Sequence, residues 1–227
     1  MNKFNKVDTT DEVNTPDTIV IYCFFGDYNS GKSYIAKSLY EKYKEDSYLT
    51  SFAESVKVEF LQLYNLTTGN NLTYRDLINN REIKEKLRDQ IIRYAEDVKL
   101  TRGSDYWFRT LIRRVINEIE SRPNINKIFI DDLRFEVEFI NLINFIQEAE
   151  EEFGFHMFDL HLIEVKSNRS KKDPQLAINK ELIEKIENII NKKLTYVIYN
   201  NERFSCQTNE QTECQNSSGV EFDLSSF

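Results

Sequence analysis

Apolar residues gather in short continuous runs along this chain, and the stretches between the runs repeat apolar positions at helical intervals. The runs are rich in β-branched and aromatic residues, which is typical of buried strands. Strands are predicted at 18–25, 48–52, 127–132, 161–165 and 194–199, and helices at 32–44, 54–64, 81–99, 105–120, 136–152 and 181–190. Because strands alternate with helices, the pattern predicts an α/β fold of three layers, with a parallel sheet flanked by helices.

Changes in composition divide the chain into a central domain and two polar ends. Residues 1–17 are polar and include four acidic side chains, which predicts a flexible leader and not a signal peptide. The domain is expected to cover 18–200, with a helical substrate-binding insertion at about 53–122. Residues 201–227 are rich in Ser, Thr, Gln, Asn and Glu, so this tail is expected to be weakly ordered.

A glycine-bounded loop connects the first predicted strand to the first helix. Its spacing from Gly26 to Gly31-Lys32-Ser33 satisfies the phosphate-binding pattern G-x-x-x-x-G-K-[ST] in full. Backbone N–H groups of such a loop and the following helix N-terminus attract a polyphosphate. Lys32 would reach the β- and γ-phosphates, and the Ser33 hydroxyl would ligate Mg²⁺. The residues predicted to bind the nucleotide are Gly26, Asp27, Asn29, Ser30, Gly31, Lys32, Ser33 and Tyr34. The pattern therefore predicts a P-loop fold that uses ATP and Mg²⁺.

Two acids, Asp131 and Asp132, end the third strand and form a candidate second element of the site. A carboxylate at the carboxyl end of a parallel strand would lie beside the phosphate loop and hold the water shell of Mg²⁺. The same acids are also suited to capping a helix. The pattern does not decide which of the two faces the site.

Four further residues and one loop each have a functional and an ordinary interpretation. Phe52 and Lys57 follow the second strand, where they would contact a second substrate, or serve as a core phenylalanine and a solvated lysine. Arg88 lies among acids, which also suits a surface ion pair. Trp107 is the only tryptophan, and packing in the core is its ordinary role. The loop at 168–174 is basic and would close over phosphates as a lid, or is a solvated turn.

The charge balance narrows the classes of partner. The formal net charge is −8, which argues against a general nucleic-acid binder or a membrane-surface protein. Three widely spaced cysteines and two histidines supply no metal-ligand spacing, and they fit a reducing cytosolic setting. No apolar run is long enough to cross a bilayer.

The order of these pieces resembles the bacteriophage-type deoxynucleoside monophosphate kinases, a branch of the P-loop nucleoside monophosphate kinases. The resemblance covers about 20–200. Beside the P-loop, it rests on Phe52-Ala53 with Lys57, on an arginine-bearing helix that leads into an aspartate-aromatic-tryptophan stretch (Arg88 to Trp107), on Asp132-Leu133-Arg134-Phe135 with Glu138, and on a last strand that runs into Asn200. The helix at 84–96 also resembles the animal phosphomevalonate kinases, which share this architecture.

The resemblance implies that the protein transfers a phosphoryl group from ATP to a small phosphate monoester. Lys57, Arg88 and Arg134 would bind the acceptor phosphate, and Arg169 would belong to the lid. The site expected from the motifs and the resemblance comprises Lys32, Arg134 and Arg169 as catalytic residues, Phe52, Lys57, Arg88, Trp107, Asp132 and Arg134 as acceptor contacts, and Ser33 and Asp132 as metal ligands.

The leading hypothesis is therefore a kinase of nucleoside or deoxynucleoside monophosphates that needs ATP and Mg²⁺. Its partners would be small molecules, with no nucleic acid polymer and no membrane, and a homodimer stays open. The expected location is the cytoplasm, or that of a host if the chain is viral. The alternatives are a kinase of a non-nucleotide phosphate such as phosphomevalonate, and a nucleotide-binding module without turnover.

Overall fold

A computed structural model of the chain describes residues 18–153 and 157–200. The predicted leader at 1–17 and the predicted tail at 201–227 lie outside the described residues. The elements are β1 (Ile19–Phe25), α1 (Lys32–Lys42), a 3₁₀ turn (Lys44–Asp46), β2 (Ser47–Thr50), α2 (Phe52–Thr68), α3 (Tyr74–Asn79), α4 (Arg81–Arg102), α5 (Tyr106–Ser121), β3 (Lys127–Ile130), α6 (Glu136–Phe153), β4 (Phe158–Lys166), α7 (Lys180–Ile190) and β5 (Thr195–Asn200).

The five strands form one sheet in the order β2-β3-β1-β4-β5, and every neighbouring pair is parallel. β1 lies in the centre, where all of its residues except Val20 are buried. A strand covered on both faces needs apolar side chains on both sides, which explains its continuous apolar sequence. The prediction of a parallel α/β sheet flanked by helices is confirmed.

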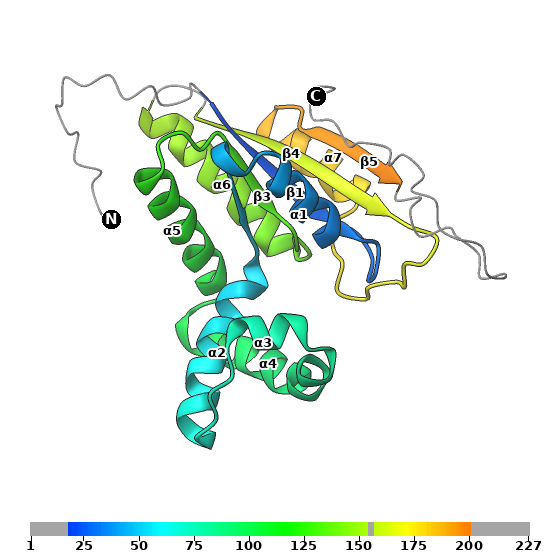
Figure 1. Cartoon of the computed structure of the whole chain (residues 1–227). Coiled ribbons are helices and arrows are strands. Elements are labelled where there is room, and N and C mark those ends of the chain that lie inside the picture. Colours follow the sequence, from blue (N-terminus) through cyan, green and yellow to red (C-terminus); the bar gives the residue numbers. More distant parts are fainter. Residues whose placement is uncertain (1–17, 154–156, 201–227) are drawn as a thin grey trace.

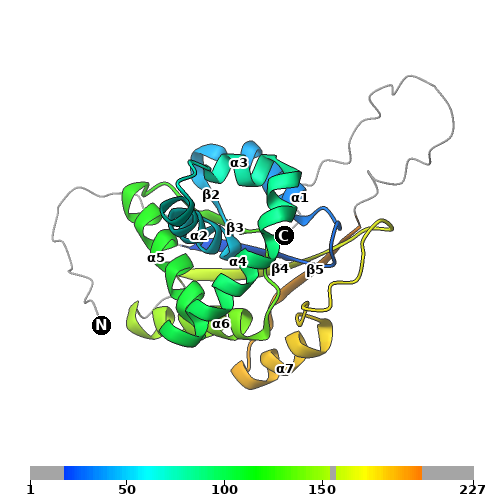
Figure 2. The ribbon, with the colours of Figure 1, turned by 90° about the horizontal axis from the view of Figure 1, so that it is seen from below.

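Helices cover the two faces of the sheet unequally. On one face Ile35 and Leu39 of α1 pack against Tyr22 and Phe24 of β1. On the other face α5, α6 and α7 form a larger core that includes Cys23 and the other side chains of β1 that point to that side. Figure 2 shows α1 on one side of the strands and α5, α6 and α7 on the other.

The helices α2, α3 and α4 form a lobe beyond the edge at which the strands end (Figure 1). They have a small core of their own around Phe60, Leu77 and Leu87, and share a second one, around Val98, with Trp107 at the start of α5. The fourth helix of the predicted insertion, α5, instead packs against the sheet. The helical insertion as a separate unit stays a prediction.

The element boundaries differ from the prediction at two places in this region. Phe52 was expected to end a strand but begins α2, because its N–H and that of Ala53 are capped by the carboxylate of Asp132 at 2.7 and 2.9 Å. α3 was not predicted, since six residues show too little periodicity to reveal a helix. The sequence signal for α3 was a capping box. The side chain of Thr73 accepts the N–H of Asp76, and the side chain of Asp76 accepts the N–H of Thr73.

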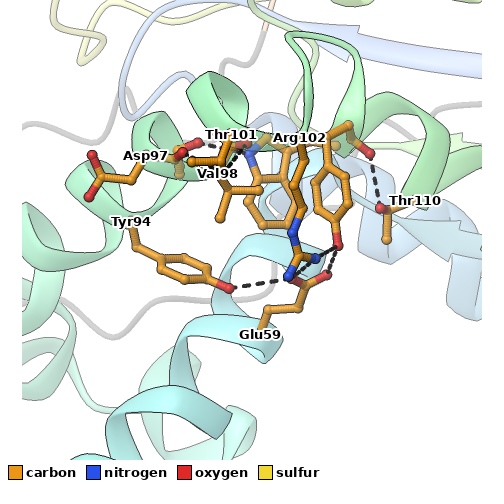
Figure 3. Close-up of polar contacts among 10 residues, drawn as sticks. Glu59, Tyr94, Asp97, Val98, Thr101, Arg102 and Thr110 are labelled. Atoms are coloured by element: carbon orange, nitrogen blue, oxygen red, sulfur yellow. Dashed lines mark hydrogen bonds and ion pairs between the residues drawn. The ribbon is translucent and has the colours of Figure 1, made fainter.

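A partly buried polar network joins the helices around the lobe (Figure 3). The carboxylate of Glu59 on α2 accepts hydrogen bonds from the hydroxyls of Tyr106 on α5, at 2.9 Å, and Tyr94 on α4, at 3.3 Å. Arg102 donates to the Tyr106 hydroxyl at 2.7 Å and lies 3.9 Å from the same carboxylate. The indole N–H of Trp107 donates to the carbonyl of Ala95 at 3.1 Å. Three helices are thereby fixed to one another around a single carboxylate.

No helix among the described residues has the length and apolar character that crossing a membrane requires.

We expect Glu59→Ala to destabilise the protein by about 0.5–1.5 kcal/mol, because two partly buried tyrosine hydroxyls lose their acceptor. Amide hydrogen exchange should rise first in α4, and thermal unfolding should shift to lower temperature. Glu41→Ala, at an exposed position on α1, serves as the control. Equal exchange in α4 for the two variants would contradict a stabilising role for the network.

Candidate active site

The phosphate loop at 26–33 joins β1 to α1 at the carboxyl edge of the sheet. Gly26 has φ +142°, and a Cβ added there would lie 2.3 Å from the carbonyl oxygen of Val165 on β4. Asn29 and Gly31 also take positive φ, at 61° and 93°. Only glycine fits at the first position, so the motif reflects a close approach between two strand ends as well as loop curvature.

The ammonium group of Lys32 lies inside this loop. The residue is 7% exposed, and its Nζ donates to the carbonyl oxygens of Gly26 at 3.1 Å and Asp27 at 3.2 Å. Burial lowers its pKa, and the positive charge of Arg134 lowers it further. A buried ammonium held only by neutral carbonyls is ready to exchange them for an anion.

The two acids at the end of β3 have different surroundings. Asp132 uses both carboxylate oxygens to cap α2. Asp131 instead receives a hydrogen bond from Ser33, while burial, and secondly the charge of Asp132, raise its pKa to about 6. The structure thus places Asp131, and not the expected Asp132, beside the candidate metal ligand Ser33. The Ser33 hydroxyl and the Asp131 carboxylate are the oxygen donors that Mg²⁺ prefers.

Glu138 holds the turn that follows these acids. Its Oε2 accepts the N–H groups of Arg134 at 3.0 Å and Phe135 at 3.1 Å. Burial, and then the neighbouring Asp132, raise the pKa of this carboxyl to about 8. This turn sets the direction in which the Arg134 side chain leaves the backbone.

Cationic side chains from α2, α4 and the turn after β3 act on one another's charge. Lys57 on α2 lies near Asp131 and lowers, by its charge, the pKa of Lys84 on α4. Arg88 and Arg134 act on Lys84 in the same direction, although its partial burial is the largest cause. Arg88 is held by a two-point contact with Glu85 at 2.9 and 3.0 Å. The structure thus brings the predicted Lys57, Arg88 and Arg134 together and adds Lys84.

A second set of groups near Asp131 consists of hydrogen-bond acceptors. Glu54 pairs with Arg114 at 2.6 Å. Burial raises the pKa of the Tyr74 hydroxyl to about 12, and the carboxylates of Glu54 and Asp131 contribute. This part of the site is therefore rich in carboxylates, in contrast to the cationic cluster.

Two predicted acceptor contacts lie in the core instead. Phe52 is 3% exposed and belongs to the large core beneath the sheet. Trp107 is 5% exposed and packs among Val56, Val98 and the Tyr94 ring. Their ordinary interpretation, packing, is the one that the structure supports.

The basic loop after β4 lies against the phosphate loop. Tyr28 and Lys171 exchange both backbone hydrogen bonds, at 2.9 and 2.8 Å. Arg169, the predicted lid residue, is exposed near the start of this loop. Tyr34, expected to bind the nucleotide, is 49% exposed in the first turn of α1.

The sequence interpretation missed Lys84, Tyr74, Glu54 and Asp173. Lys84 stands one helical turn before Arg88, and that spacing was the available signal. Tyr74 and Glu54 meet only in the folded chain, and no local pattern indicates their contact.

The sheet order, the glycine-bounded loop and its buried lysine together define a P-loop kinase. The sequence model of the phosphomevalonate kinase family matches residues 24–149, which is more than half of the chain. The chain belongs to the phosphomevalonate kinase family, and the prediction of a kinase is confirmed.

Two other comparisons add little. A sugar kinase from Janibacter sp., solved without ligand, is similar over 81% of this chain and 85% of its own, at 10% identity and a TM-score of 0.32. This similarity is too low to support an inference about function. No curated protein matches the chain.

The Glu138 carboxyl predicts a dependence of stability on pH. An ordinary glutamate in the unfolded chain loses its proton near pH 4.3, whereas this one retains it to about pH 8 when folded. The unfolded state therefore binds fewer protons in that interval, and stability falls as pH rises, by at most about 1.4 kcal/mol per pH unit.

Glu138→Gln should flatten this dependence, because a side-chain amide oxygen can still accept both N–H groups but carries no titrating proton. Urea unfolding at pH 5, 6, 7 and 8 measures the effect. The wild-type midpoint should fall more steeply with pH than that of E138Q. Parallel curves would contradict a protonated Glu138 in the folded protein.

Proposed function

We propose that the protein transfers the γ-phosphoryl group of Mg-ATP to a phosphate monoester, and that this acceptor is a nucleoside or deoxynucleoside monophosphate. The observation that carries the proposal is the pairing of two anion sites. The phosphate loop with Lys32 provides one, and the cluster of Lys57, Lys84, Arg88 and Arg134 provides the other. Arg134 is close enough to both that it affects the pKa of Lys32 and of Lys84.

The chemistry requires positioning and charge neutralisation. An oxygen of the acceptor phosphate attacks the γ-phosphorus, the bond to the β–γ bridging oxygen breaks, and ADP leaves. A phosphate monoester is largely ionised at pH 7, so the attacking oxygen needs no general base. Arg134 and Lys32 would neutralise charge on the transferring group. Ser33 and Asp131 would hold Mg²⁺, which would neutralise negative charge on the ATP phosphates.

The carboxylate-rich part of the site favours a nucleotide as the acceptor. Glu54 and the Tyr74 hydroxyl lie on the Asp131 side of the cations. A nucleobase offers N–H donors to such groups. The carboxylate of phosphomevalonate has no N–H donor for these groups.

Family membership favours the other acceptor. The matched segment at 24–149 contains the phosphate loop, the cationic cluster and Asp131, and the family is named for phosphomevalonate. Phosphomevalonate is therefore the second candidate.

Lys32→Ala should abolish phosphoryl transfer, because no other side chain in the loop places a positive charge on the β- and γ-phosphates. Coupled ADP release with Mg-ATP measures the activity, and circular dichroism checks that the fold persists. Lys37→Ala, at an exposed position on α1, is the matched control. Near-normal activity in K32A would disprove the assignment of the site.

An acceptor panel separates the candidates. We expect product with at least one of the common ribo- or deoxyribonucleoside monophosphates and none with phosphomevalonate. Glu54→Gln should raise KM for the nucleotide more than it lowers kcat, because Glu54 is expected to bind the base. Activity confined to phosphomevalonate would overturn the nucleotide assignment. Calorimetric ATP binding with no product from either class would favour a nucleotide-binding module without turnover.

A further inference from the structure

The segment at 170–177 is attached to two other loops of the site. Its Lys171 is paired with Tyr28 of the phosphate loop through two backbone hydrogen bonds. The N–H of Asp173 donates to Oδ1 of Asp27 at 3.0 Å, and that of Ala177 donates to the carbonyl of Arg134 at 2.8 Å. Three segments distant in sequence thus meet around Asp173.

The side chain of Asp173 is fully buried at this junction. Its Oδ1 accepts the N–H of Gln175 at 3.0 Å, and its Oδ2 lies 3.8 Å from Nη1 of Arg134. Burial, and then Asp173, raise the pKa of the Tyr28 hydroxyl. A buried carboxylate is costly unless it is paired, and Arg134 is its cationic neighbour.

Two side chains flank the guanidinium group of Arg134. Its guanidinium carbon lies 5.4 Å from the centre of the Tyr28 ring, and Asp173 faces its Nη1. Its Nε is buried and has no hydrogen-bond partner among the described residues. The guanidinium thus contacts a ring and a carboxylate, while its Nε remains an unused donor.

This arrangement keeps two positive charges side by side. Arg134 lowers the pKa of Lys32, whereas Asp173 raises it and so opposes that effect. Of the other groups that act on Lys32, Asp132 and Asp131 also oppose it. The negative charge of Asp173 thus lowers the electrostatic cost of holding Arg134 next to Lys32 before substrates bind.

We propose that Asp173 is a positioning residue, which orients Arg134 beside Lys32 for the transferring phosphoryl group. The part of this inference that concerns catalysis rests on the proposed function. It also assigns the segment at 171–177 to the fixed wall of the site.

Asp173→Asn tests the proposal, because the side-chain amide oxygen can still accept the Gln175 N–H while the charge is removed. We expect kcat to fall on the order of 10- to 100-fold, the size that misplacing a catalytic group produces. The KM for ATP should change little, because the phosphate loop keeps its backbone contacts. Asp159→Asn, which changes a carboxylate that is hydrogen-bonded to His161 on β4, is the matched control and should leave kcat unchanged.

Two further measurements separate positioning from a general loss of structure. In an Arg134→Ala background, D173N should have little additional effect on kcat, since the group that it orients is gone. Nitrogen-15 relaxation of the Arg134 Nε–H group should indicate an ordered side chain in the wild type and a mobile one in D173N. The Arg88 Nε–H group, held by Glu85, should not change.

The outcomes are distinct. An unchanged Arg134 Nε–H signal in D173N, or additive effects of the two substitutions on kcat, would overturn the proposal. If the wild type binds ATP but phosphorylates no acceptor, the proposed function fails, and the relaxation measurement alone decides whether Asp173 positions Arg134.

Discussion

The close approach of β1 and β4 at Gly26 is the constraint on which the site depends. No side chain fits between the α-carbon of Gly26 and the carbonyl of Val165. The chain therefore leaves β1 in a conformation with positive φ and turns at once into the loop around Lys32. The same contact places the segment that follows β4 next to that loop. The absence of a side chain at Gly26 thus determines where both the phosphate loop and the segment after β4 lie.

In this site, the pKa values of charged groups depend on burial as well as on neighbouring charges. Lys32 is held by carbonyl groups, while burial raises the pKa of Asp131 to about 6 and that of Glu138 to about 8. Among the described residues, Asp173 forms an ion pair with the guanidinium of Arg134. Burial thus weakens the acidity of two carboxyl groups beside the cations that are expected to bind phosphate.

The sequence was informative wherever a local pattern determined the structure. The phosphate loop has fixed spacing, and long amphipathic helices such as α4 have enough turns to reveal their period. Prediction failed where the decision lay in tertiary contacts. Asp131 and Asp132 are adjacent and identical in type, and only the position of the α2 N-terminus makes one of them a cap. Trp107 and Phe52 looked like ligand contacts because aromatic residues serve both binding and packing.

Helix α4 connects distant parts of the molecule. Lys84 and Arg88 near its start belong to the cationic cluster, while Lys99 near its end lies 4.9 Å from the centre of the Phe135 ring. The Glu59 network ties α4 to α2 and α5. One helix therefore carries two cations of the candidate acceptor site and a third cation that contacts Phe135, the residue after Arg134, so these groups are positioned together.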